Sequence, residues 1–339
     1  MPVSVGQTAL DGSGAARDVG DNERTHLMEV EMSESHAVVI VSGGAAVSPF
    51  TTPTEGCGSG LAAGNTDTAL RESLLNAGHQ VFTSPAAAGE GEVVEDTGWG
   101  GFSGAPIVLP ASMTVNAVGD IDAAGASLLR FWQHLQEAYG VTTLDVVGHS
   151  MGGLFSRAAI RLAKEQGATL TFRSLTTIGT PWTGAFSADY AAGDVPIADC
   201  QGDPTCEASM TKFAQLVSES SQGAGQEVTD RYLGGTDGWN ERQGTALEGI
   251  PVVLLGGDHF SQPGAPDVWP NDGLVAIGSA LAANVSSTVL PSRATRTFPD
   301  VHSIFFTHLL DLPMERGLTW DPEVLDAVAY AVANPGRVA

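Results

Sequence analysis

The stretch that decides the fold is LDVVGHSMGG, residues 144–153, in which the pattern Gly-x-Ser-x-Gly joins an apolar run to a helix-like run. Such a serine sits on a very tight turn, so that its hydroxyl projects above the sheet. Gly148 and Gly152 lack the side chains that would clash where strand and helix pass close together. The N-terminus of the following helix adds the positive end of a dipole behind Ser150. We therefore predict a strand–turn–helix unit with Ser150 as a candidate nucleophile.

Apolar runs alternate with amphipathic runs on both sides of this unit. The expected strands are residues 36–44, 79–85, 141–150, 170–181 and 249–257, and the expected helices are residues 66–78, 118–139, 151–167 and 322–332. This alternation predicts an α/β fold with a mostly parallel central sheet and helices on both faces.

Two segments depart from this alternation. Residues 1–33 are polar and rich in Gly and Asp, which indicates a tail or a peripheral element before a domain that covers residues 34–335. Residues 182–248 are rich in Gly, Asp, Ser and Gln, with only short helical patches, and they are far longer than a typical connection. We expect this second segment to form a cap or lid insertion.

Four short motifs resemble those of bacterial lipases and esterases of the α/β-hydrolase superfamily, and they follow that family's order. They are GHSMGG at 148–153, TIGTPWTG at 177–184, NDGLV at 271–275 and VHS at 301–303. The first resembles the family's nucleophile elbow, the third its acid segment and the fourth its histidine segment. The resemblance implies the α/β-hydrolase fold and a serine esterase chemistry.

A serine nucleophile needs an imidazole base and a carboxylate that orients it, and in this fold the chain order is Ser, acid, His. Order leaves His302, in a polar loop, and His308, in an apolar patch where a core histidine is the alternative; we favour His302. Asp272 in NDGLV and Asp258 after the strand PVVLL compete as the acid, and the resemblance favours Asp272.

Two backbone N–H groups must receive the negative charge of a tetrahedral intermediate. Met151, directly after the nucleophile, is expected to supply one. The other is expected from the glycine turn Ser42-Gly43-Gly44-Ala45, at Gly44 or Ala45; related lipases usually have His-Gly there, and this chain does not.

The cap segment contains an apolar patch at helical spacing: Met210, Phe213, Leu216 and Val217. One interpretation is a lid helix over an acyl pocket, with Phe213 and Leu216 contacting substrate. The other is a helix packed permanently on the core.

Composition excludes several partners. With 39 acidic and 15 basic residues the net charge is −24, which disfavours nucleic acid and anionic lipid. No apolar run is long enough to span a bilayer, and the N-terminus does not resemble a signal peptide. The sequence therefore does not decide the cellular compartment.

Cys200 and Cys206 are close enough in sequence to form a small disulfide, which would leave Cys57 without a disulfide partner.

The leading functional hypothesis is a carboxylic ester hydrolase, either lipase or esterase, that acts on a small-molecule or lipid ester without a cofactor or metal. An acyltransferase or thioesterase with the same three residues is one alternative. A hydrolase-like binding protein without catalysis is another, and an intact set of Ser150, Asp272 and His302 disfavours it.

Overall fold

The computed structural model describes residues 35–50, 67–94, 107–219, 223–235, 237–262 and 267–339. The expected segment 1–33 and Cys57 lie outside these residues. The strands are β1 Ser35–Val41, β2 Val81–Thr83, β3 Ala86–Ala87, β4 Val115–Asn116, β5 Val141–His149, β6 Thr171–Ile178, β7 Val252–Gly257 and β8 Arg293–Phe298.

The longer helices are α1 Thr68–Asn76, α2 Ile121–Tyr139, α3 Met151–Glu165, α4 Phe186–Ala192, α5 Pro204–Glu219, α10 Ile304–Leu309 and α11 Pro322–Ala333. The four-residue helices are α6 Ala224–Glu227, α7 Asp230–Leu233, α8 Trp239–Arg242 and α9 Ile277–Ala280. The described residues also include the 3₁₀ turns η2 Ala111–Met113, η3 Ile197–Cys200 and η4 Met314–Arg316.

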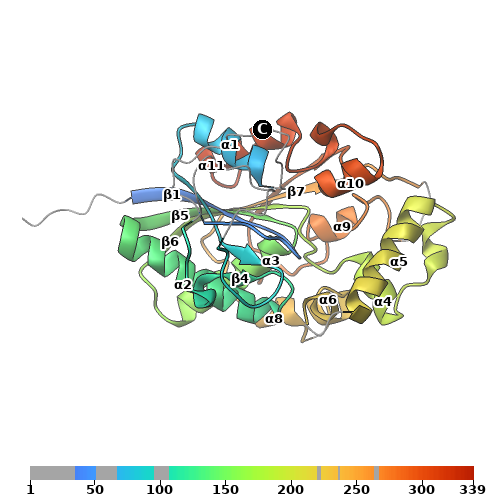
Figure 1. Cartoon of the computed structure of the whole chain (residues 1–339), viewed down its shortest axis with the longest axis horizontal. Coiled ribbons are helices and arrows are strands. Elements are labelled where there is room, and N and C mark those ends of the chain that lie inside the picture. The colour runs from blue at the N-terminus through green and yellow to red at the C-terminus, as the bar shows by residue number, and fades with distance from the viewer. Residues whose placement is uncertain (1–34, 51–66, 95–106, 220–222, 236, 263–266) are drawn as a thin grey trace, which may run out of the picture. The chain divides into compact units, whose positions relative to one another are not determined.

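Six strands form a parallel sheet in the order β2-β1-β5-β6-β7-β8, with helices on both faces (Figure 1). Alternate residues of β1 show how the sheet divides two cores. Val39 and Val41 pack with α2 and α3, whereas Val38 and Ile40 pack with α1 and α11. The prediction of a mostly parallel sheet flanked by helices is confirmed. Strand β8 was not expected, because its side chains alternate between exposed and half-buried and are mostly Arg and Thr.

Glycines permit the close contact between β1, β5 and α3. A Cβ on Gly152 would lie 2.1 Å from the carbonyl oxygen of Val41, and a Cβ on Gly148 would lie 2.6 Å from the backbone nitrogen of Gly153. Ser150, between them, has φ 54° and ψ −130°, a strained conformation for a residue with a side chain. The sharp turn that the sequence predicts is therefore present, and it sets the serine at the carboxyl end of the sheet.

Buried polar contacts connect residues 182–248 to the sheet's helices. The guanidinium of Arg157 on α3 is buried and stacks on Trp182 at 4.1 Å and on Trp239 at 4.8 Å, measured to the ring centroids. Burial lowers the pKa of Arg157 to about 9, so the group remains a cation at neutral pH and favours the two aromatic faces. The parts of the segment near its two ends are thus attached to α3, the helix that follows Ser150.

Within this segment, Cys200 and Cys206 form a disulfide that joins η3 to α5. Met210 of α5 is buried beside this bridge in a small cluster that includes Phe186 and Trp269. The Cys200–Cys206 disulfide, which the sequence makes possible but does not decide, is therefore present. The first half of α5 is firmly packed.

The loop that precedes α10 is held by backbone hydrogen bonds and encloses a buried carboxyl group. Val301 N–H donates to Arg316 O at 2.9 Å, and Leu318 N–H donates to Val301 O at 3.0 Å. The side chain of Asp300 is fully buried, with Arg316 Nε 3.5 Å from its Oδ1. Burial, and then the neighbouring Asp321 carboxylate, raise the pKa of Asp300 to about 7.

We predict that Asp300→Asn makes the stability of the protein less dependent on pH. In the unfolded chain Asp300 loses its proton near pH 4, whereas in the folded chain it keeps the proton until about pH 7. The folded state therefore loses stability as pH rises through this window, and an uncharged amide removes that loss. The melting temperature should be measured at pH 5 and at pH 8 for both proteins. Between these pH values it should fall further for wild type than for the variant, and the two falls should differ by about 2 °C or more. Equal falls would contradict the raised pKa.

Candidate active site

Three of the predicted residues meet at the carboxyl end of the sheet, although 152 residues separate the first from the last. Ser150 Oγ lies 2.9 Å from His302 Nε2, and His302 Nδ1 lies 2.7 Å from Asp272 Oδ2. All three side chains are buried, with exposed fractions of 7%, 3% and 0% for Ser150, His302 and Asp272. This unbroken chain of hydrogen bonds from hydroxyl to carboxylate can move a proton from the serine to the imidazole.

The loop after β7 positions the carboxylate. Oδ1 of Asp272 accepts hydrogen bonds from the N–H groups of Leu274 at 3.0 Å and Val275 at 2.7 Å, which leaves Oδ2 for the imidazole. The backbone carbonyl of Asp272 also accepts the N–H of His302 at 2.8 Å. Asp272 therefore fixes both the ring and the backbone of His302.

The competing residues lie elsewhere. Asp258 directly follows β7 and its N–H donates to Phe298 O at 2.9 Å, but among the described contacts its carboxylate does not reach His302. His308 lies on α10 with an exposed side chain, so it is not the core histidine that the sequence offered as its alternative. The apolar run after Asp272 forms only the short helix α9.

The glycine turn after β1 lies directly against the serine. A Cβ on Gly43 would come within 2.6 Å of Ser150 Cβ, and a Cβ on Gly44 within 2.9 Å of Met151 Sδ. The N–H of Ala45 donates to Ala117 O at 3.1 Å, so that group already has an acceptor. The N–H of Gly44 has no backbone acceptor within the described parts of the chain. Met151 opens α3, where backbone N–H groups lack partners within the helix.

His149, which lies inside the elbow directly before Ser150, packs beside His302. Its Nε2 lies 3.0 Å from the carbonyl oxygen of His302, and the two ring centroids are 5.0 Å apart. From its place in the elbow, the sequence alone predicts a side chain that points into the sheet. The GHS motif places it next to Ser150, but the sequence carries no signal for a contact with a loop so far along the chain.

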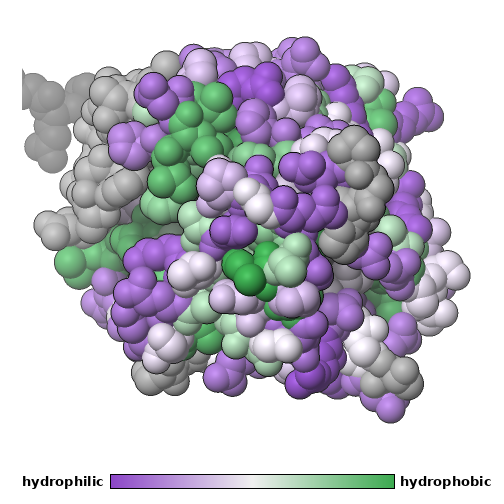
Figure 2. Space-filling view, turned by 90° about the vertical axis from the view of Figure 1, so that its right-hand side faces the viewer, coloured by the Kyte–Doolittle hydropathy of each residue, from purple (hydrophilic) through white to green (hydrophobic). Residues whose placement is uncertain are grey.

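Helix α5 contacts the loop that carries Asp272, because Ser209 Oγ donates to the carbonyl oxygen of Gly273 at 2.7 Å. Phe213 is half-buried against the main core, and Leu216 is 51% exposed. On α10, directly after His302, Phe305 and Leu309 are also largely exposed. The surface at this end of the sheet correspondingly shows apolar patches among polar atoms (Figure 2).

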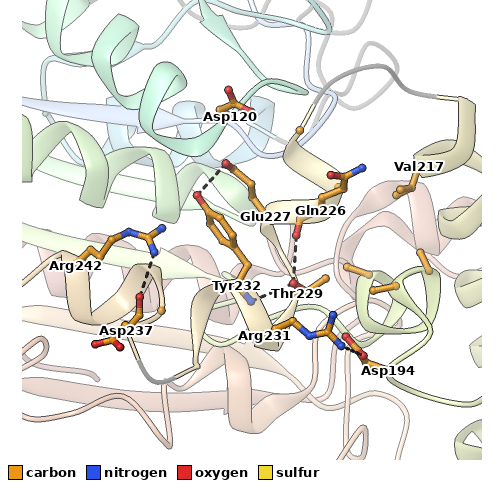
Figure 3. Close-up of a pocket in the computed structure, with 16 residues that line it drawn as sticks. Asp120, Asp194, Val217, Gln226, Glu227, Thr229, Arg231, Tyr232, Asp237 and Arg242 are labelled. Carbon is orange, nitrogen blue, oxygen red and sulfur yellow. Dashed lines mark hydrogen bonds and ion pairs between the residues drawn. The ribbon is translucent and has the colours of Figure 1, made fainter.

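A cavity of about 710 Å³ lies among α4, α6, α7 and α8 and the start of α2 (Figure 3). Its lining does not include Ser150, Asp272 or His302. Glu227 is one of its lining residues, and the two oxygens of its carboxylate accept the hydroxyl of Tyr232 at 2.9 Å and the N–H of Ile121 at 2.6 Å. The polar wall of this cavity therefore caps α2, and we assign it no part in the site.

The described residues contain no group of three or more His, Cys, Asp or Glu side chains arranged to hold a metal ion. Nor do they contain a helix that is long and apolar enough to cross a membrane.

Comparisons with known proteins agree with this architecture. Residues 78–238 match the model of a family described as an alpha/beta hydrolase of unknown function. Over 98 residues the chain is 37% identical to triacylglycerol lipases of Pseudarthrobacter phenanthrenivorans and Burkholderia plantarii. That match covers 28% of this chain, 29% of the first relative and 26% of the second.

Among solved structures, lipase 1 from Pelosinus fermentans is similar over 88% of this chain and 99% of its own, with 13% identity and a TM-score of 0.47. Together, the parallel sheet, the strained serine turn and the family model matched over residues 78–238 show that this chain has an α/β-hydrolase fold.

Proposed function

We propose that the protein is a serine carboxylic ester hydrolase that forms an acyl-enzyme on Ser150. The observation that carries this proposal is the hydrogen-bonded series Ser150–His302–Asp272, with distances of 2.9 and 2.7 Å. The similarity of part of the chain to two triacylglycerol lipases supports an ester as the substrate.

In the proposed reaction, His302 Nε2 takes the proton of Ser150 Oγ as this oxygen attacks the ester carbonyl carbon. Asp272 accepts the Nδ1–H of His302, which keeps the lone pair on Nε2 directed at the serine. His302 then gives the proton to the leaving alcohol, and the acyl group remains on Ser150. A water molecule, deprotonated by the same imidazole, releases the acid and restores the serine.

We further propose that the N–H groups of Met151 and Gly44 stabilise the oxyanion of both tetrahedral intermediates. Met151 lies at the start of α3, where N–H groups without partners and the helix dipole favour negative charge. Gly44 is preferred to Ala45 because the N–H of Ala45 is already bonded to Ala117 O.

Residues 182–248 are proposed to act as the cap of the domain that covers residues 34–335, with α5 as a fixed wall beside the site. The disulfide, the burial of Met210 and the bond from Ser209 to Gly273 all hold the first half of α5 in place. Phe213 and Leu216, further along α5, are proposed to contact the acyl chain.

An acyltransferase or a thioesterase would use the same three residues, and the geometry does not favour either over hydrolysis. A binding protein without catalysis is disfavoured, because the serine, histidine and carboxylate keep hydrogen-bonding distances throughout.

We predict that wild type hydrolyses p-nitrophenyl esters and that Ser150→Ala abolishes this turnover without unfolding the protein. The substitution removes the attacking oxygen and one hydrogen bond, but no packed carbon atoms. Turnover should be measured over a series of acyl lengths, with circular dichroism of both proteins as the control. A folded variant that keeps more than about a thousandth of the activity would contradict the assignment of the nucleophile.

We predict that Asp272→Asn lowers kcat by about three orders of magnitude or more, because the imidazole loses the acceptor that fixes its tautomer. Asp258→Asn is the matched control and should lower kcat by less than about tenfold. The comparison needs kcat for both variants on one soluble ester. The reverse ranking would move the acid to Asp258.

We predict that replacing Phe213 and Leu216 with Ser lowers turnover of long-chain esters but spares p-nitrophenyl acetate, because only a long acyl chain reaches α5. Tyr330→Ser on α11, another partly exposed ring, is the control and should change neither rate. For wild type, a fixed α5 predicts smooth saturation with a triglyceride emulsion. A sharp rise in rate above the substrate's solubility limit would instead indicate a mobile lid.

A further inference from the structure

His149 makes a hydrogen bond whose direction is fixed by its partner. Its Nε2 lies 3.0 Å from the carbonyl oxygen of His302, and a carbonyl oxygen can only accept, so Nε2 carries the proton. The other ring nitrogen, Nδ1, is buried and has no hydrogen-bond partner among the described residues. The ring is therefore held as the neutral tautomer with its proton on Nε2.

Neutrality matters here because the ring centroid of His149 lies only 5.0 Å from that of His302. In the proposed reaction His302 becomes a cation, and a second cation at this distance would oppose that step. Burial, and then the nearby charge of His302, lower the pKa of His149 to about 3, so His149 stays neutral at any working pH.

His302 is held at three points. Asp272 provides two of them, since its carbonyl oxygen accepts the backbone N–H of His302 and its carboxylate accepts the ring N–H. The third is the bond from His149 to the carbonyl of His302. His149 ends β5 directly before Ser150, so this bond attaches the loop of the base to the strand of the nucleophile.

On this geometry, and resting on the proposed function, we infer that His149 is a positioning residue for the proton transfer between Ser150 and His302. It donates its Nε2–H to the His302 carbonyl and thereby fixes the distance between the imidazole of His302 and the hydroxyl of Ser150. His149 does not touch the substrate and does not exchange its own proton. Its effect falls on kcat, because the distance between Ser150 Oγ and His302 Nε2 decides how readily the proton moves.

Three variants of His149 separate the hydrogen bond from the packing of the ring. His149→Gln keeps an N–H donor close to the position of Nε2, His149→Asn moves the donor back to the position of Nδ1, and His149→Phe keeps a ring without a donor. The Phe and Asn variants should lower kcat, and the rate of labelling of Ser150 by a fluorophosphonate, about tenfold with KM unchanged, the loss expected for one buried hydrogen bond. Gln should recover most of both rates.

Equal losses in Gln, Asn and Phe would overturn the inference, because they would make ring packing the cause. Wild-type rates in Phe would overturn it too. Since a variant can fail to fold, a second measurement uses wild type labelled with ¹⁵N-histidine. The inference predicts a neutral His149 with its proton on Nε2 from pH 8 down to about pH 4, and a ring that titrates in this range would overturn it. Absence of fluorophosphonate labelling in wild type would contradict the proposed function instead, and the ¹⁵N spectrum would still decide the His149 contact.

Discussion

The close approach of α3 to the end of β1 is the constraint on which the site depends. Gly152 leaves room for the carbonyl oxygen of Val41 at a distance where any Cβ would collide, and Ser150 turns the chain with a left-handed φ of 54°. This conformation costs free energy, which the surrounding packing of β5, β6 and α3 must offset. In return it lifts the serine side chain above the sheet and brings the start of α3 against the glycine turn at Gly43 and Gly44.

The partners of Ser150 depend on this arrangement in different ways. His302 and Asp272 come from loops after β8 and β7, and they reach the serine because parallel strands deliver their carboxyl ends to one edge of the sheet. The backbone bond between the two residues and the contact from His149 then fix the imidazole. The loops after β7 and β8 thus converge on one turn whose position is set by two glycines.

Much of this could be predicted from the sequence, because the signals are local. The elbow at 148–153 specifies its own turn, and the apolar runs of β1, β5, β6 and β7 specify buried parallel strands. Asp272 and His302 stand in motifs that resemble those of bacterial lipases, and the structure brings both to Ser150. The register of the glycine turn stayed open, since the sequence does not reveal that Ala45 donates to Ala117.

Other features have no local signal. Strand β8 lies at an edge of the sheet and carries Arg and Thr, so its pattern is not that of a buried strand. The contact of His149 with the carbonyl of His302, and the stacking of Arg157 between Trp182 and Trp239, join residues that are far apart in the chain. Such contacts follow from tertiary packing, which periodicity and motif spacing do not encode.

The central claim is that Ser150 carries the covalent intermediate. The most direct measurement is to react the protein with a fluorophosphonate, digest it and locate the adduct by mass spectrometry, with ester hydrolysis followed in parallel. The account predicts one adduct per chain, on the peptide that contains Ser150, and loss of hydrolysis in proportion to labelling. An adduct on another residue, or full hydrolysis by a protein labelled at Ser150, would contradict it.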